Sequence, residues 1–211
     1  MSEAPAQLPK KRERTRNALI EAAIDVLAEK GLEGTSIDDL MRVAGMARGT
    51  FYNYFQTRDD VVRAVADFIH GELHRQVLSR VSPDWDDDII AGCVCYGFIR
   101  YALDHPTIGW TLVRLGGAKH WVSGDTQHHC VDGALQRLLG EDEAMLVGQT
   151  YVEGVVLMLL RRLLEGRITL AEAERVLSLA WRGLGVRSGR LKKVLEVARG
   201  FVEEKNPQQQ L

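Results

Sequence analysis

Two short helical segments joined at a glycine, within residues 36–54, constrain the fold of this chain more than any other feature. Ser36 is a favourable helix N-cap, and Asp39 three residues later completes a capping-box pattern for a helix that Gly45 ends. A second short helix is predicted over about residues 47–54. Helices of this length are not stable alone, so both must pack on the helices before and after them.

A longer amphipathic helix is predicted on each side of this pair. The first covers about residues 12–30, with apolar side chains three and four residues apart, and Gly31 ends it. The second has Thr57 as its N-cap and Asp60 at the third helical position, and it continues to about Leu78. These segments together predict a small N-terminal helical domain.

The second short helix has two different faces. Phe51 and Phe55 are four residues apart, so they share one face and are expected to be buried. At about 100° per residue, the other side chains point away from that core: Gly49, Thr50, Tyr52 and Asn53. A short helix with a small, polar and aromatic outer face suits the major groove of DNA.

This segment resembles the helix-turn-helix of TetR-family transcriptional regulators. The resemblance rests on TSIDDL, which begins at Thr35, and on AGMARGTFYNYFQTRDDV, which begins at Ala44, and it covers about residues 12–60. It implies a homeodomain-like three-helix DNA-binding domain. It also implies a repressor that binds a palindromic operator as a homodimer and is released by a small-molecule ligand.

The resemblance also implies which residues contact DNA. They are Thr35, Ser36, Arg42, Arg48, Gly49, Thr50, Tyr52, Asn53, Tyr54 and Arg58. Tyr54 and Arg42 have an alternative role as solvated surface residues. Ala47 stands where the family often has a capping serine, which costs about 1 kcal/mol of local helix stability. Asp38 and Asp39 favour the helix dipole but repel DNA, so no DNA contact is predicted for Asp38.

The rest of the chain is also predicted to be all-α, with about nine to ten helices in total. Further helices are expected over about residues 84–104, 107–116, 124–139, 141–165, 169–183 and 188–204. Thr169 and Glu172 form a capping-box pattern at the start of the fifth of these. The predicted organisation is a disordered tail (1–11), a DNA-binding domain (12–80) and a helical ligand-binding and dimerisation domain (84–211). The net charge is −2, so any DNA contact must come from locally placed charge, such as the basic run at residues 10–16.

Aromatic and sulfur-containing residues in the second domain are candidates for lining a ligand pocket. They are Cys93, Tyr96, Tyr101, Trp110, Trp121, Tyr151 and Met158, with Val155 beside them. Such a pocket favours a flat or apolar ligand, and ordinary core packing is the alternative. Arg100 and Glu153 stand in apolar helices, where they could pair with each other or face solvent, or Arg100 could receive an acidic ligand.

A homodimer interface is predicted on the segments 141–165 and 169–183. Gly148 and Gly154 permit close approach of helices, and leucines supply apolar area for a two-fold four-helix bundle. The alternative is that these leucines fill the core of one subunit.

Several other functions are not expected. No nucleophile, base and orienting acid form a recognisable motif, so no enzyme activity or cofactor is predicted. Adjacent His128, His129 and Cys130 diverge on a helix, and no metal site is expected. The absence of a signal-peptide core or a long apolar run predicts a cytoplasmic protein without a membrane partner. A small-molecule-binding helical protein and a TetR-type activator remain the alternative functions.

Overall fold

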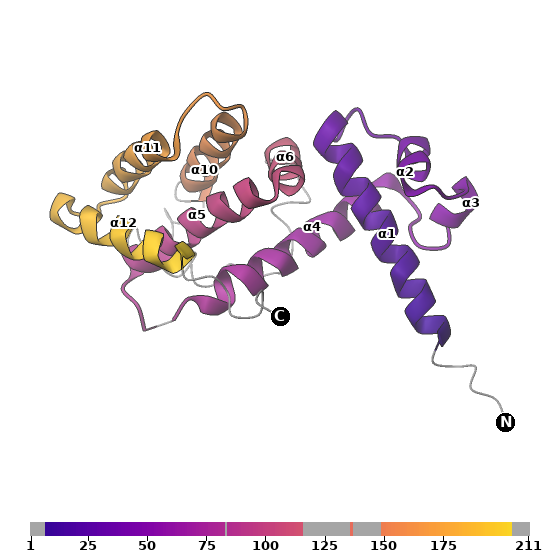
Figure 1. The fold of residues 1–211 in the computed structure, drawn as a ribbon, viewed down its shortest axis with the longest axis horizontal. Helices are drawn as coiled ribbons and strands as arrows, with labels where there is room; N and C mark the ends of the chain where they lie inside the picture. Colours follow the sequence, from indigo (N-terminus) through magenta and orange to yellow (C-terminus); the bar gives the residue numbers. More distant parts are fainter. Residues whose placement is uncertain (1–6, 83, 116–135, 137–148, 204–211) are drawn as a thin grey trace. The chain divides into compact units, whose positions relative to one another are not determined.

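The computed structural model describes residues 7–82, 84–115, 136 and 149–203. Within these residues the protein has nine α-helices, one 3-10 helix and no strand, which confirms the all-α prediction (Figure 1). The elements are α1 (Gln7–Lys30), α2 (Ile37–Ala44), α3 (Arg48–Phe51), α4 (Arg58–Gln76), η1 (Leu78–Arg80), α5 (Asp87–Asp104), α6 (Pro106–Leu115), α10 (Gln149–Leu164), α11 (Leu170–Gly183) and α12 (Ser188–Glu203).

The chain divides into two compact units. The N-terminal unit comprises Met1–His70 and Trp110–Asp125, and the C-terminal unit comprises Gly71–Gly109 and Thr126–Leu211. The divisions fall inside α4 and inside α6, whereas the sequence placed one boundary near residues 80–85. Three segments covered by the predictions lie outside the part of the chain that the structure describes. They are residues 124–139 apart from Gln136, residues 141–148 and residues 204–211.

Helix α1 is longer than the sequence indicated. It begins at Gln7, so the disordered tail predicted for residues 1–11 is too long. Residues 1–6 lie outside the described part of the chain. Pro9 falls in the first turn, where backbone N–H groups have no intrahelical partner, so the missing donor costs no hydrogen bond. The lysines and arginines that follow are good helix formers. The basic run is therefore part of the helix.

Local capping signals were predicted correctly. The Ser36 side chain accepts from the Asp39 N–H at 3.1 Å, and the Asp39 carboxylate accepts from the Ser36 N–H at 3.3 Å. Thr169 and Glu172 form the same reciprocal pair at the start of α11. Gly45 ends α2 in a left-handed conformation with φ 63°, which glycine adopts without strain.

Helix α3 is shorter than predicted. It spans four residues and gives way to turns up to Tyr54, with Asn53 N–H donating to Thr50 and Tyr54 N–H donating to Phe51. Its N-cap, Ala47, makes no side-chain capping bond, as the sequence indicated. An uncapped single turn is not stable by itself, so packing must hold it in place.

The C-terminal unit is built around the contact between α5 and α12. A Cβ atom at Gly92 would lie 2.5 Å from Cγ1 of Val194, so a glycine is needed for this close approach. Arg190 at the start of α12 donates to Asp88 at 2.6 Å and also to Asp86. Helices α10 and α11 pack together and complete the core with Trp181. No helix in the described ranges is long and apolar enough to span a membrane.

Candidate nucleic-acid interface and ligand cavity

Two phenylalanines anchor α3 in the N-terminal unit. Phe51 is fully buried, Phe55 is 5% exposed, and their ring centroids lie 5.7 Å apart. This confirms the prediction that both belong to the core. The buried face of α1, which includes Leu19, Ala23 and Leu27, contributes to the same unit. Burial of the two rings fixes which face of α3 remains outside.

The opposite face of α3 is open to solvent. Arg48, Gly49, Tyr52 and Asn53 are exposed, and Thr50 is half-buried. A Cβ atom at Gly49 would meet nothing within 4 Å, so a partner could approach the backbone closely at this position. The structure therefore brings these five predicted DNA contacts together on or beside one helical turn.

Arginine and lysine residues around α2 are paired with two aspartates. Nη1 of Arg48 donates to both carboxylate oxygens of Asp38, at 2.8 and 3.0 Å. Asp39 lies 2.5 Å from Nζ of Lys30 and 3.2 Å from Nη2 of Arg42. The hydrogen bond from Lys30, together with those from Ser36 and Arg42, holds the pKa of Asp39 well below its ordinary value. Asp39 is thus charged at neutral pH, and both carboxylates have cationic partners.

Three of the predicted contact residues hold the turn before α2. The buried Thr35 hydroxyl donates to the Gly31 carbonyl at 2.6 Å, and the Ser36 hydroxyl donates to the Asp39 carboxylate at 2.7 Å. Nη1 of Arg58 donates to the carbonyl oxygens of Leu32 and Thr35 at 3.2 and 3.3 Å. These side chains shape the start of α2, and their contacts with DNA remain predictions.

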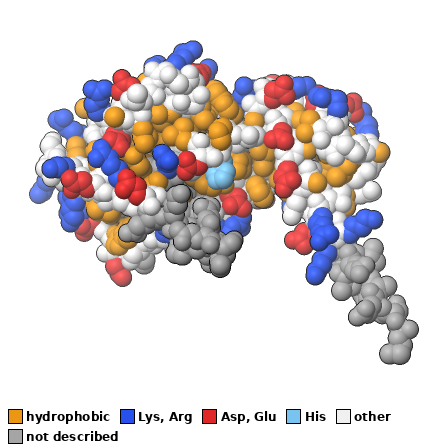
Figure 2. All heavy atoms as spheres, in the orientation of Figure 1, with side chains coloured by type: hydrophobic (Ala, Val, Ile, Leu, Met, Phe, Trp, Pro, Cys, Tyr) orange, Lys and Arg blue, Asp and Glu red, His pale blue; other side chains and the backbone are white. Residues whose placement is uncertain are grey.

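The basic start of α1 lies next to the aromatic residues that follow α3. Figure 2 shows Lys and Arg side chains gathered at the beginning of α1. The Arg12 guanidinium lies 6.0 Å from the ring centroid of Tyr54, and that of Arg16 lies 5.7 Å from the centroid of Phe55. Sequence reasoning did not single out Arg12 and Arg16. Their four-residue spacing, which places both on one helix face, was the available signal.

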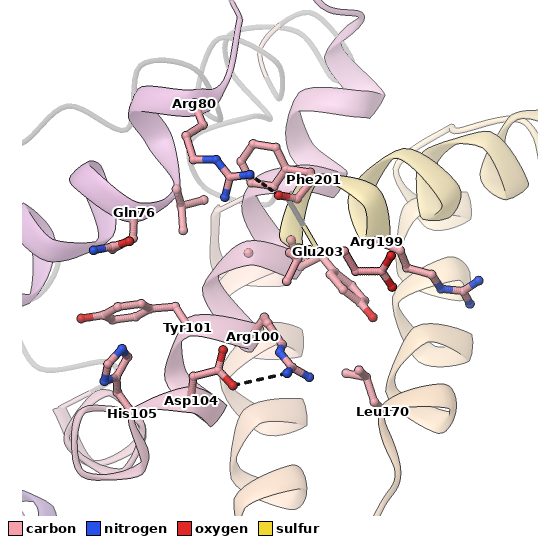
Figure 3. A pocket seen from close by; sticks show the side chains of 14 residues that line it. Gln76, Arg80, Arg100, Tyr101, Asp104, His105, Leu170, Arg199, Phe201 and Glu203 are labelled. Atoms are coloured by element: carbon pink, nitrogen blue, oxygen red, sulfur yellow. Dashed lines mark hydrogen bonds and ion pairs between the residues drawn. The ribbon is translucent and has the colours of Figure 1, made fainter. Parts of the chain in front are cut away.

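A cavity of about 660 Å³ lies in the C-terminal unit (Figure 3). Of the predicted ligand residues, Tyr96, Arg100 and Tyr101 line it. The other lining residues are Gln76, Val77, Arg80, Gly97, Asp104, His105, Leu170, Arg199, Phe201, Val202 and Glu203. The cavity is thus formed where the end of α4 and η1 meet α5, α11 and α12.

The lining of this cavity combines aromatic rings with charges of both signs. Arg80 lies over the Phe201 ring, 4.3 Å from its centroid, and donates to the Phe201 carbonyl (Figure 3). The Tyr101 and His105 rings are 4.6 Å apart. Burial is the main cause that raises the pKa of Tyr101 to about 12, so its hydroxyl stays protonated at neutral pH. The cavity can hold an apolar body and offer hydrogen bonds to polar groups.

The remaining predicted ligand residues lie elsewhere. Cys93 is buried in the core of the C-terminal unit, Trp110 belongs to the N-terminal unit, and Trp121 lies outside the described residues. Tyr151 and Met158 are exposed on α10, and Val155 is half-buried there. The five of these residues that the structure describes do not line the cavity.

The structure also answers whether the charges in the apolar helices are buried. Arg100 and Glu153 are both exposed. Arg100 pairs with Asp104 at 3.4 Å, one turn along α5. The described residues contain no group of three or more His, Cys, Asp or Glu side chains that could hold a metal ion.

Comparison with known proteins identifies the N-terminal segment. Residues 19–65 match the family described as "Bacterial regulatory proteins, tetR family". The chain is 35% identical over 79 residues to the uncharacterized HTH-type transcriptional regulator YvdT of Bacillus subtilis (strain 168), a match to 37% of this chain and 41% of that protein. It is 36% identical over 72 residues to the HTH-type transcriptional repressor LfrR of Mycolicibacterium smegmatis, covering 34% and 36% of the two chains.

These curated relatives are matched over about two fifths of their length. Solved structures match more of the chain at lower identity. A TetR-like transcriptional regulator from Rhodococcus sp. RHA1 has a TM-score of 0.63 at 22% identity, covering 82% of this chain and 97% of that one. A gamma-butyrolactone receptor (ArpA like protein) has a TM-score of 0.58 at 19% identity, covering 92% and 100%. This likeness confirms the fold: an N-terminal helix-turn-helix followed by a helical domain.

Proposed function

We propose that this chain, which belongs to the tetR family of bacterial regulatory proteins through residues 19–65, is a cytoplasmic transcriptional repressor. In this proposal it binds a palindromic operator as a homodimer, and a small-molecule effector releases it. The observation that carries the proposal is the outer face of α3, where Arg48, Gly49, Tyr52 and Asn53 are exposed around a buried Phe51.

The chemistry of this face fits a DNA groove. A guanidinium can donate two hydrogen bonds to a guanine, and an amide can pair with an adenine. Arg48 and Asn53 supply these groups, and the open position at Gly49 permits close approach of the backbone. The basic start of α1 adds phosphate contacts, although the net charge of the chain is −2.

Exposed apolar side chains on α10 and α11 support a homodimer. Tyr151, Met158, Val176 and Leu179 are 39, 50, 42 and 62% exposed, and they account for four of the six large exposed hydrophobic residues in the described part of the chain. Gly154 on α10 has open space around its Cβ position. A second copy that covers these two helices would bury this surface in a four-helix bundle.

The 660 Å³ cavity is the proposed effector site. Its volume suits a small molecule, and its lining residues come from five helical elements, so an occupant can favour one arrangement of them over another. One structural neighbour is described as a gamma-butyrolactone receptor, which is consistent with ligand binding on this fold. The mixed lining favours a ligand with an apolar body and polar groups over a purely apolar one.

Operator selection from a random DNA library tests the DNA-binding part of this proposal. We expect a two-fold symmetric sequence whose binding weakens steeply as salt rises. Tyr52→Ala and Asn53→Ala should each weaken operator binding about tenfold or more with unchanged thermal unfolding. Lys192→Ala, which removes an exposed charge on α12, is the control. Selection of no sequence by the purified protein would exclude the repressor.

Small molecules that release the protein from its operator test the effector site. Arg100→Ala should alter the concentration of effector required for release and leave operator affinity in the absence of effector unchanged. Glu153→Ala removes an exposed charge on α10 outside the cavity and should change neither. An effector response that is the same in both variants would place the ligand elsewhere.

A promoter reporter separates a repressor from an activator. Deletion of the gene should raise expression from the operator-containing promoter if the protein represses it. A fall in expression would establish the activator alternative. If the protein binds small molecules but no DNA, the alternative of a small-molecule-binding helical protein replaces the repressor.

A further inference from the structure

Asp38 is placed to control the arginine that begins α3. It is the second residue of α2, and both of its carboxylate oxygens accept from Nη1 of Arg48, the first residue of α3. Both side chains remain more than half exposed, at 69% for Asp38 and 59% for Arg48. The Tyr52 side chain and the Asp38 carboxylate together hold the pKa of Arg48 above its ordinary value. The guanidinium is therefore held between two exposed side chains of the proposed interface.

Folding accounts for this aspartate only in part: it lies in the first turn of α2, where a carboxylate favours the helix dipole. Asp39, its neighbour, closes the capping box of α2 and pairs with Lys30 and Arg42. Asp38 takes no part in the capping box, and its hydrogen bonds go to Arg48. Exposed ion pairs contribute little to stability. A carboxylate at a surface that binds a polyanion also opposes binding, so its presence there calls for a functional explanation.

The geometry leaves part of the guanidinium free. An arginine carries five N–H donors in a planar fork, and Asp38 engages one nitrogen, Nη1. The remaining donors can contact the O6 and N7 atoms of a guanine while the ion pair stays intact. When the protein contacts phosphates alone, no hydrogen bond from Arg48 to a base offsets the repulsion between the Asp38 carboxylate and the DNA backbone.

We propose that Asp38 is a specificity-determining residue that positions Arg48 for a base edge and penalises binding to DNA through phosphates alone. This inference rests on the proposed DNA-binding function. It predicts that the carboxylate lowers affinity for non-operator DNA much more than affinity for the operator. The ratio of the two affinities is therefore the quantity that Asp38 controls.

Asp38→Asn keeps the shape of the side chain and removes its charge. We expect affinity for non-operator DNA to rise about fivefold and affinity for the operator to change less than about twofold. The slope of log affinity against log salt for non-operator DNA should steepen by about 1, since Arg48 is freed for one more phosphate. Asp67→Asn, which removes an exposed charge from α4 in the same unit, is the matched control and should leave the ratio unchanged.

A double-mutant cycle shows whether Asp38 acts through Arg48. The affinity ratio is measured for Asp38→Asn, Arg48→Ala and the double variant, on the operator selected by the natural chain and on an unrelated duplex. Asp38→Asn should lower the ratio at least about threefold when Arg48 is present and leave it unchanged when Arg48→Ala is also present. A role of Asp38 in folding alone would shift thermal unfolding without moving the ratio.

The possible results are distinct. Equal increases in operator and non-operator affinity for Asp38→Asn would overturn the inference, and so would an equal loss of specificity in the Asp67→Asn control. A loss that persists in the Arg48→Ala background would also overturn it. If the natural chain selects no operator, the proposed function fails, and this inference falls with it.

Discussion

Glu174 is a buried carboxylate in the C-terminal unit. It is 7% exposed, and it accepts from the Tyr96 hydroxyl at 2.7 Å and from Nε of Arg199 at 2.9 Å. These bonds join α11 to α5 and α12 beside the cavity. The Arg199 hydrogen bonds hold the pKa of Glu174 below its ordinary value, so the folded state favours the ionised form.

Glu174→Gln should therefore destabilise the protein in a pH-dependent way. At pH 7 we expect the free energy of unfolding to fall by about 1–2 kcal/mol, a moderate loss because Arg199 is half exposed. The contribution of the carboxylate is fully present above the pKa of an unfolded glutamate, about 4.3, and is lost as the pH falls through the lower folded pKa. Urea unfolding at pH 7 and at stepwise lower pH should show the two proteins converging.

Glu196→Gln on α12 is the control for this experiment. Glu196 is 59% exposed, and its distance to Lys192 is 3.8 Å, so its loss should change stability by less than about 0.5 kcal/mol. A difference between the natural chain and Glu174→Gln that stays constant with pH would contradict the assigned role of the carboxylate.

The two described cysteines are expected to be unreactive. Cys93 and Cys95 are buried, and burial raises the pKa of the first thiol to about 11 and of the second to about 12. In a Cys130→Ser variant at pH 8, a thiol reagent should label neither until the protein is unfolded in guanidinium. Full labelling after unfolding is the control, and rapid labelling of the folded protein would contradict this prediction.

At the scale of elements, two glycines near α3 should respond oppositely to alanine. Gly45 has φ 63°, where a side chain is strained, and Gly49 is helical with open space around its Cβ position. Gly45→Ala should lower the free energy of unfolding by about 1 kcal/mol. Gly49→Ala should raise it by about 0.5 kcal/mol while it weakens DNA binding. Thermal unfolding and operator binding, measured on both variants, separate the two effects.

Each variant serves as the control for the other, because both add one methyl group to a position without steric neighbours. Equal destabilisation by the two substitutions would show that left-handed backbone geometry does not determine the cost at Gly45.

Elements whose signals are local were predictable from the sequence. The Ser36–Asp39 and Thr169–Glu172 capping boxes depend on side chains three residues apart, and both form as expected. The length of α3 was not predictable, because the missing cap at Ala47 and the burial of Phe51 in the folded unit both bear on it. The sequence placed the start of α1 at about residue 12, although Lys10 and Lys11 before it also favour helix.

At the scale of the whole molecule, the proposed homodimer depends on the exposed faces of α10 and α11. Leu179→Glu should weaken dimerisation at least about tenfold, because two-fold symmetry places the new charge in the interface twice. Sedimentation velocity over a range of protein concentrations measures this change. Val43→Glu, at a 43% exposed position on α2, is the matched control and should not affect assembly. A fully dimeric Leu179→Glu protein would exclude this interface.

The cavity was only partly predictable. Tyr96 and Tyr101 were identified as aromatic residues of the segment that forms α5, and Arg100 as a charge within the same apolar segment. Arg80 and Phe201 were not, since they are 121 residues apart and meet only in the folded unit. Sequence spacing carries no information about such contacts, and the expected aromatic and apolar lining was replaced by one with charges of both signs.

The single turn of α3 separates the residue that anchors it in the core from the residues proposed to contact DNA. Phe51 fixes the turn in the core, whereas Gly49 and Asn53 face solvent and contribute nothing to that packing. Exchanges at the outer positions therefore leave the scaffold intact. Under the proposed function, duplicated copies of such a gene can diverge toward new target sites through a few substitutions around one turn, without first acquiring compensating changes elsewhere in the chain.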